Sequence, residues 1–242
     1  MTFIRPLTLI ALFAFTLASC KKDDSVQSVA PKDRIKTYTE SINSSVLGVN
    51  SYTWNLSYDD RGRLSTMVNA ENSGNRFVFT YAENGFDMDI FSGNAIVIHQ
   101  DAFVNGNRMD STFQYNDEGD TTTEKYTYNP GNLLVKLNRY VYNNGSPELD
   151  ETVDYSYDNN NNLISEIGNF THIEYEYNGS LPGIIDLFPL FYSSSQKLPS
   201  RVIDHSGYTA EHTYTVDARN RVVSDIAVLN TGDTITKTYV YE

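Results

Sequence analysis

The chain has 242 residues, with 18 basic and 31 acidic side chains and a formal net charge of −13 at pH 7. Such an acidic chain is poorly suited to neutralise phosphates, which argues against a nucleic-acid partner. The single cysteine excludes an intramolecular disulfide and a zinc site built from several cysteines. An aromatic content of 13% argues against disorder, and the length is ample for a hydrophobic core.

The N-terminal segment has the pattern of a secretory signal. A short basic start that ends at Arg5 precedes an apolar run over residues 7–18. This run is shorter than the roughly 20 residues of a membrane-spanning helix. The sequence Leu17-Ala18-Ser19-Cys20 resembles the bacterial lipobox, in which the cysteine is lipidated and becomes the first residue. We therefore expect a signal peptide over residues 1–19 and lipid attachment at Cys20, with an ordinary signal and an unrelated cysteine as the alternative.

A charged stretch follows the cysteine and reads Lys21, Lys22, Asp23 and Asp24. A lysine and two acids directly behind a lipidated cysteine resemble the export signal of Bacteroidota surface lipoproteins; a generic charged linker is the alternative. Residues 20–32 are rich in Ser, Gln, Pro and charge, which is typical of a flexible tether. The expected location is the outer membrane, exposed at the surface, with the membrane as a partner through the lipid.

A short block recurs along the rest of the chain. Tyr58-Asp59-Asp60-Arg61-Gly62-Arg63-Leu64 has a counterpart at residues 157–163 and another at 216–222, with looser copies from Tyr81, Tyr115, Tyr128 and Tyr177. The fourth residue after the start of a block is Gly62, Gly85, Gly119, Asn161 or Asn220, and Gly and Asn adopt a positive φ most readily. An Asp or Asn after the tyrosine can initiate a turn by bonding the backbone. Each block therefore predicts a β-hairpin.

The flanks of these blocks alternate between aromatic and small polar residues. Tyr52, Trp54, Leu56 and Tyr58 alternate with Ser, Thr and Asn, and similar runs recur up to Tyr241. This period of two indicates half-buried antiparallel strands with the aromatic face inward. We expect one all-β domain over residues 33–242, a meander of roughly fourteen strands rolled into a barrel-like sheet.

One segment breaks the alternation. Residues 184–192 are dense in apolar side chains and do not alternate, and Pro182 and Pro189 argue against a sheet strand. We expect one short helical insert there, packed against an open end of the sheet. It serves either as a cap for the core or as a lid or partner contact.

The tyrosine blocks resemble the YD repeats of Rhs-type proteins. The whole chain resembles a family of Bacteroidota lipoproteins of unknown function with a porin-like barrel, through its lipobox, its Tyr-Asx hairpins, Ile185-Asp186-Leu187 and Leu198-Pro199. The uneven spacing of the blocks favours a closed or nearly closed meander over a regular superhelical shell. The family assigns no activity. A true pore is not expected, because the non-aromatic face is polar and a membrane barrel needs an outward apolar band.

Residues that could carry chemistry are few. If Ser206 and Gly207 form a two-residue turn, His205 faces Tyr208 and His212 faces Arg201, so these histidines do not converge on a metal. Residues 158–162 resemble the start of a calcium loop but lack its central Gly and distal Glu. The sequence contains no Gly-x-Ser-x-Gly, His-Glu-x-x-His or phosphate-loop motif. We therefore expect no catalytic residues, no metal and no cofactor.

The resulting functional hypothesis is a non-catalytic cell-envelope lipoprotein that acts as a binding or structural module. The alternative is a carbohydrate-binding accessory lipoprotein of a glycan-uptake system, because aromatic rings with Asn, Asp and Tyr suit sugars; an envelope protein is the other possible partner. Most tyrosines are expected to anchor hairpins, with the ring in the core and the hydroxyl at the rim, and so are not available for a ligand. The aromatic residues left for a ligand site are Phe188, Phe191, Tyr192 and Tyr208, expected at the end of the barrel near the insert.

Overall fold

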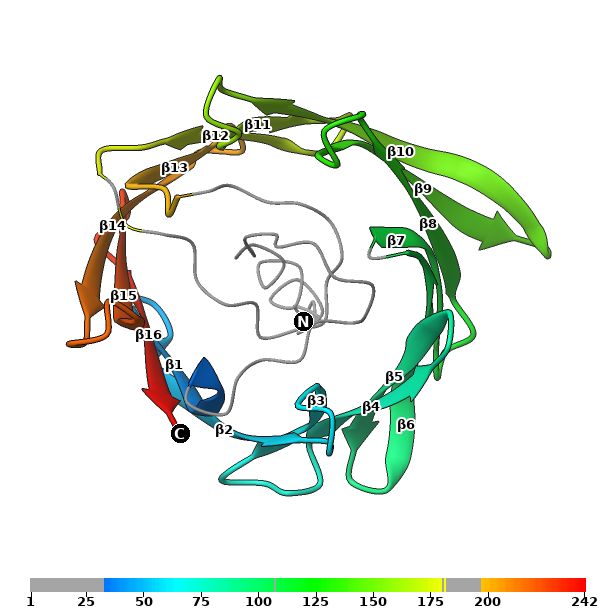
Figure 1. Cartoon of the computed structure of the whole chain (residues 1–242), viewed down its shortest axis with the longest axis horizontal. Helices are drawn as coiled ribbons and strands as arrows, with labels where there is room; N and C mark the ends of the chain where they lie inside the picture. The colour runs from blue at the N-terminus through cyan, green and yellow to red at the C-terminus, as the bar shows by residue number, and fades with distance from the viewer. Residues whose placement is uncertain (1–32, 107, 180, 182–196) are drawn as a thin grey trace.

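The computed structural model describes residues 33–106, 108–179, 181 and 197–242. Its strands form one antiparallel barrel in which each strand pairs with the next and β1 pairs with β16 (Figure 1). The sixteen strands are β1 Ile35–Ser44, β2 Gly48–Tyr58, β3 Leu64–Asn69, β4 Arg76–Ala82, β5 Gly85–Ser92, β6 Ala95–Asn105, β7 Arg108–Asn116, β8 Thr121–Tyr128, β9 Leu134–Asn143, β10 Ser146–Tyr157, β11 Leu163–Ile167, β12 His172–Glu176, β13 Arg201–Asp204, β14 Tyr208–Val216, β15 Val222–Leu229 and β16 Thr234–Tyr241.

The expected all-β meander is confirmed, and the barrel is closed. The described residues form sixteen strands rather than roughly fourteen, because strands such as the four-residue β13 show little alternation in sequence. The helical insert expected near residues 184–192, the signal segment and the tether lie outside the described residues. Within the part of the chain that the structure describes, no helix is both long and apolar enough to cross a bilayer.

The repeated turns form as expected at one end of the barrel. In the β2–β3 turn, Asp59 Oδ1 accepts hydrogen bonds from the backbone amides of Arg61 and Arg63 at 3.0 and 2.8 Å. Asp158 and Asp217 hold their turns in the same way. Positive φ values occur at Gly62, Asn161 and Asn220, as the spacing predicts.

Two copies of the block depart from this pattern. Gly85 does not have a positive φ. Glycine is required at this position because a Cβ there would lie 1.9 Å from the carbonyl oxygen of Ala102. The copy that begins at Tyr115 does form a turn with a positive φ at Gly119, but this turn joins β7 to β8 at the opposite end of the barrel. The spacing of residues predicts a hairpin, but it does not predict which end of the barrel carries it.

Tyrosine hydroxyls connect neighbouring hairpins at the end of the barrel that carries the β2–β3 turn, here called the tyrosine rim. Tyr58 donates to the carbonyl oxygen of Ile35 at 2.9 Å, which connects the end of β2 to the start of β1. The same link is made by Tyr81 to Leu64, Tyr157 to Leu134, Tyr177 to Leu163, Tyr214 to Pro199 and Tyr241 to Val222. Arginine side chains cover the rings of Tyr58, Tyr81, Tyr128 and Tyr241. The tyrosines that make these links therefore have a structural role.

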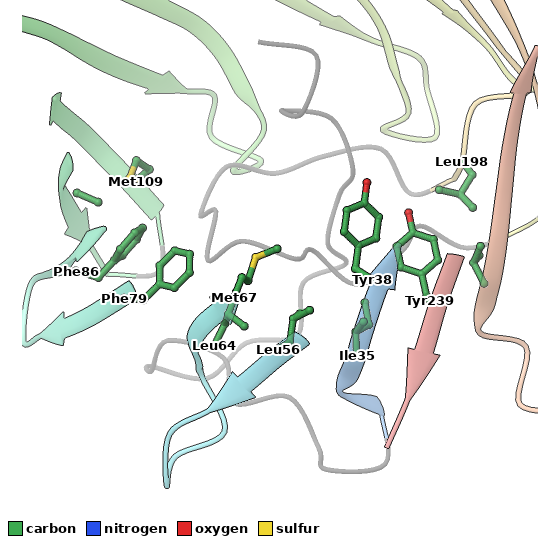
Figure 2. Packing of buried hydrophobic residues seen from close by; sticks show 12 residues of the cluster. Ile35, Tyr38, Leu56, Leu64, Met67, Phe79, Phe86, Met109, Leu198 and Tyr239 are labelled. Atoms are coloured by element: carbon green, nitrogen blue, oxygen red, sulfur yellow. The ribbon is translucent and has the colours of Figure 1, made fainter. Parts of the chain in front are cut away.

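An apolar cluster lines the inner wall near this rim. Figure 2 shows Tyr38 and Tyr239 side by side on β1 and β16, with ring centroids 5.5 Å apart. The buried members of the cluster are Ile35, Tyr38, Leu56, Leu64, Met67, Phe79, Phe86, Ala102, Met109, Leu198, Val222 and Tyr239. Leu181 packs against it, and the Leu198 amide donates to the Leu181 carbonyl oxygen at 3.3 Å. Leu181 and Leu198, which lie on either side of segment 182–196, are thus held together at the inner wall.

The inner wall also buries charged groups, each with a partner. Arg139 on β9 lies between Glu124 on β8 and Glu151 on β10, with N–O distances of 3.0 and 3.3 Å. Glu151 is 1% exposed and also accepts the Phe170 amide at 2.9 Å. Elsewhere on the inner wall, on β14 and β15, His212 Nδ1 lies 2.9 Å from Asp225 Oδ1. Buried charges need such partners, since an unpaired one is strongly destabilising.

Glu166 on β11 is the most perturbed acid of this wall. It is 1% exposed and accepts a hydrogen bond from the Tyr175 hydroxyl at 2.6 Å. Burial raises the pKa of Glu166 from 4.5 to about 7, although the hydrogen bond from Tyr175 opposes part of this rise. The folded protein therefore keeps a proton on Glu166 at pH values where the unfolded chain has released it.

The tyrosine links can be tested with a matched pair of substitutions. Tyr58 and Tyr128 both lie 5.3 Å from an arginine, but only Tyr58 makes the carbonyl link. The buried hydroxyl of Tyr128 has no hydrogen-bond partner among the described residues. We expect Tyr58→Phe to lower the free energy of unfolding by about 1 kcal/mol. Tyr128→Phe should leave it unchanged or raise it slightly. Denaturant unfolding measures both, and equal losses would contradict a structural role for the link.

The pKa of Glu166 predicts a pH dependence of stability. Between pH 4.5 and 7 the folded state binds more protons than the unfolded state, so the free energy of unfolding falls as the pH rises. The full loss is on the order of 3 kcal/mol. Glu166→Gln removes this contribution, so the stability difference between the variant and the parent should shift in favour of the variant as the pH rises. Thermal unfolding at pH 4.5 and 7.5 measures this shift, and parallel pH profiles would contradict it.

Candidate binding surface on the outer wall

Over β1, β2 and β16 the outer wall is largely a lattice of small hydroxyl side chains. Strand register places Thr37, Thr39 and Ser41 of β1 beside Asn55, Thr53 and Ser51 of β2. Their hydroxyls bond one another, as in Thr39–Thr53 at 3.2 Å and Ser41–Ser51 at 2.8 Å. Thr234, Thr236 and Thr238 continue this surface onto β16. Over these strands the outward face is polar, as the sequence predicts.

The outward face of five neighbouring strands is different. The register of β5 to β9 turns six aromatic side chains outward, here called the aromatic sector: Phe91, Phe103, Phe113, Tyr115, Tyr140 and Tyr142. In the other described strands, outward positions carry no phenylalanine, tyrosine or tryptophan. The expectation of an inward aromatic face therefore holds for the barrel except in this sector.

His99 organises the β5–β6–β7 part of the sector. Its Nδ1 lies 2.6 Å from Asp89 on β5, its Nε2 lies 2.9 Å from Asp101 on its own strand, and its ring lies 4.9 Å from that of Tyr115 on β7. Burial lowers the pKa of His99, but the hydrogen bonds to Asp89 and Asp101 outweigh it, so the pKa is raised above its usual value. The imidazole is thus held in one orientation between two carboxylates.

A third carboxylate adjoins this arrangement. Asp87 is the register partner of Asp101 across β5 and β6. Burial and the neighbouring Asp101 charge raise the pKa of Asp87. Three acids therefore adjoin His99, whose ring contacts Tyr115, and they offer more acceptor oxygens than His99 can occupy.

The β7–β9 part of the sector is a group of rings. Phe113 and Tyr142 lie edge to face with centroids 6.1 Å apart, and the Tyr142 hydroxyl lies 3.2 Å from the Thr123 hydroxyl. Lys125 lies over the ring of Tyr140 at 5.5 Å. The most exposed rings are Phe103 at 50% and Tyr115 at 44%. Exposed rings beside fixed carboxylates suit a ligand with an apolar face and hydrogen-bonding edges.

The structure describes one of the four aromatic residues expected to contact a ligand. Tyr208 is 54% exposed and begins β14, at the end of β13 that is farther from segment 182–196. Tyr208 therefore lies at the end of the barrel opposite the tyrosine rim, and β14 is separated from the aromatic sector by β10–β13 on one side and by β15, β16 and β1–β4 on the other. Phe188, Phe191, Tyr192, the lipid attachment residue Cys20 and residues Lys21, Lys22, Asp23 and Asp24 lie outside the described residues.

The paired histidines do not converge, as expected, although the turn between them differs. Asp204 pairs with Tyr208, so the loop has three residues rather than two, and Arg201 pairs with Glu211. His212 faces the inner wall, whereas His205 stacks on His172 with ring centroids 3.7 Å apart.

The calcium-like run over residues 158–162 is explained by its turn, because the Asp158 carboxylate accepts hydrogen bonds from Asn160 and Asn162.

Sequence reasoning missed the aromatic sector. The signal that could have found it is the alternation of His99, Asp101 and Phe103, in which a charged face replaces the usual Ser and Thr. Assembly of the sector depends on register, because His99 meets Asp89 and Tyr115 only when β5, β6 and β7 are aligned.

Comparisons with known proteins identify the fold alone. No protein-family model matches the chain, and no curated protein matches its sequence. A porin-like protein from Bacteroides uniformis has a TM-score of 0.63 and 18% identity, covering 89% of this chain and 99% of that chain. A porin-like protein from Bacteroides vulgatus has a TM-score of 0.59 and 12% identity, covering 86% and 98%. The expected likeness to porin-like barrels is confirmed at the level of fold.

A toxin is also structurally similar to the chain, but only weakly. The Tc holotoxin pore of Photorhabdus luminescens has a TM-score of 0.26, covering 87% of this chain and 11% of the toxin chain. This score is too low to carry an argument. The resemblance of the hairpins to YD repeats therefore rests on the sequence blocks.

Proposed function

We propose that the protein is a non-catalytic cell-envelope lipoprotein that acts as a binding module on a barrel scaffold. The observation that carries this proposal is the confinement of outward aromatic rings to β5–β9, where they lie beside Asp87, Asp89 and Asp101. Single exposed apolar residues are normal, but rings gathered on one sector of a polar wall are typical of an interaction site.

The chemistry of the sector favours carbohydrate as the ligand, which is the role of a glycan-binding accessory lipoprotein. A sugar ring presents a face of C–H groups that can stack on Tyr115 or Phe103, and its hydroxyls can donate to the neighbouring carboxylates. The hydrogen bonds from His99 fix Asp89 and Asp101 in advance, which lowers the entropic cost of binding.

The inner wall supports a scaffold role for the barrel rather than a catalytic one. The buried acids Glu151 and Glu166 and the half-buried Glu124 are bonded to Arg139 or Tyr175, which hold them in place. A hydrolytic pair of carboxylates must instead reach a substrate and exchange protons with it.

Glycan binding tests the proposal. We expect the full chain to bind members of a panel of plant, host and microbial glycans, and Tyr115→Ala to weaken binding at least tenfold. Phe170→Ala removes a ring that is 77% exposed on a loop outside the sector, so it is the matched control and should bind like the parent. Glycan arrays followed by calorimetry measure this. Loss of binding in Tyr208→Ala but not in Tyr115→Ala would move the site from the aromatic sector to the start of β14. A negative panel with folded protein would contradict the carbohydrate assignment.

Lipid anchoring is a separate part of the proposal and has its own test. In a Bacteroidota host, we expect the chain to fractionate with the outer membrane and to incorporate an alkyne-labelled fatty acid. Cys20→Ser should abolish labelling and release the protein from the membrane fraction, whereas Ser19→Ala should change neither. Equal membrane association of the parent and Cys20→Ser would contradict attachment at Cys20.

A further inference from the structure

A second cluster on the outer wall combines two imidazoles and a carboxylate. His172 and Glu174 lie two residues apart on β12 and so share its outward face, and His205 lies in the loop after β13. The three ligand atoms lie within 4.8 Å of one another. The side chains are 43–46% exposed, so solvent and ions can reach them.

The backbone holds the two strands of this cluster in register. The His205 amide donates to the His172 carbonyl oxygen at 2.9 Å, which aligns the two residues across the strand pair. The loop that carries His205 is braced by Asp204, which accepts the Ser206 amide at 2.8 Å through Oδ1 and the Gly207 amide at 3.0 Å through its carbonyl oxygen. The positions of the two histidines are therefore set by strand pairing rather than by side-chain packing.

The distances within the cluster fit a shared ion better than direct hydrogen bonds. Glu174 Oε1 lies 3.4 Å from His172 Nε2 and 3.2 Å from His205 Nε2. Good N–H···O bonds have lengths of about 2.7–3.2 Å, so the first contact is too long and the second lies at the limit. Two ligands that are each about 2.1 Å from a tetrahedral ion lie about 3.4 Å apart.

We propose that His172, Glu174 and His205 bind a divalent transition-metal ion of the zinc and copper class. Two imidazole nitrogens and one carboxylate oxygen are ligands that these ions accept, whereas Ca²⁺ and Mg²⁺ prefer oxygen alone. The two rings are stacked 18° from parallel, so binding requires them to rotate apart until the plane of each passes through the ion. Their exposure on the outer wall permits this rotation. Three protein ligands leave a coordination position for water or for a donor atom of a bound partner.

Titration of the metal-free full chain with Zn²⁺ tests the proposal. We expect one ion per chain by calorimetry, with an affinity that falls at least tenfold in His172→Ala and in His205→Ala and severalfold in Glu174→Gln. The matched control is Glu176→Gln, which removes the next outward carboxylate of the same strand and should bind like the parent. Unchanged affinity in both histidine variants would overturn the assignment.

A spectroscopic readout separates ligation from indirect effects on folding. With Cu²⁺, the parent should show electron paramagnetic resonance splittings from two imidazole nitrogens, and His172→Ala should show one. Circular dichroism should give the same melting behaviour for parent and variants, because the side chains are nearly half exposed. A Cu²⁺ spectrum without imidazole splittings in the folded parent would also overturn the proposal.

Discussion

The pairing of β1 with β16 is the constraint on which the rest of the structure depends. It joins residues at the two ends of the described chain, such as Tyr38 and Tyr239, in one register. Once the sheet is closed, every residue of a strand faces either the inner or the outer wall, and no sheet edge is left unpaired. The buried tyrosine pair, the charged groups of the inner wall and the hydroxyl lattice of the outer wall all follow from this division.

The inner wall shows how the barrel accommodates polar groups. Rings and aliphatic chains fill the part near the tyrosine rim, and charged residues occupy positions where the register gives each one a partner, as for Glu124, Arg139 and Glu151. Such networks stabilise little relative to apolar packing, but they penalise any register in which a partner is lost. The buried charges therefore contribute to the choice of one strand alignment over its neighbours.

The local structure was predictable from the sequence because it depends on short-range chemistry. Tyr58, Asp59 and Gly62 define a hairpin through contacts within a few residues, and the period of two defines which residues share a face. The binding surface was not predictable, because His99 meets its partners through register across three strands. The contact of His172 with His205 was even harder to predict, because a long connection separates β12 from β13 and alternation does not specify how the two strands align.

Both ends of the barrel chain lie at the tyrosine rim, as do the end of β12 and the start of β13. The amide of Glu242 donates to the carbonyl oxygen of Arg34 at 2.9 Å, so the two ends of the barrel chain meet there. The opposite end consists of short turns. A surface, bead or fusion partner joined directly at Asp33 or at Glu242 therefore lies at the same end of the cylinder. Both attachments present the side wall and the far turns to solution in the same orientation.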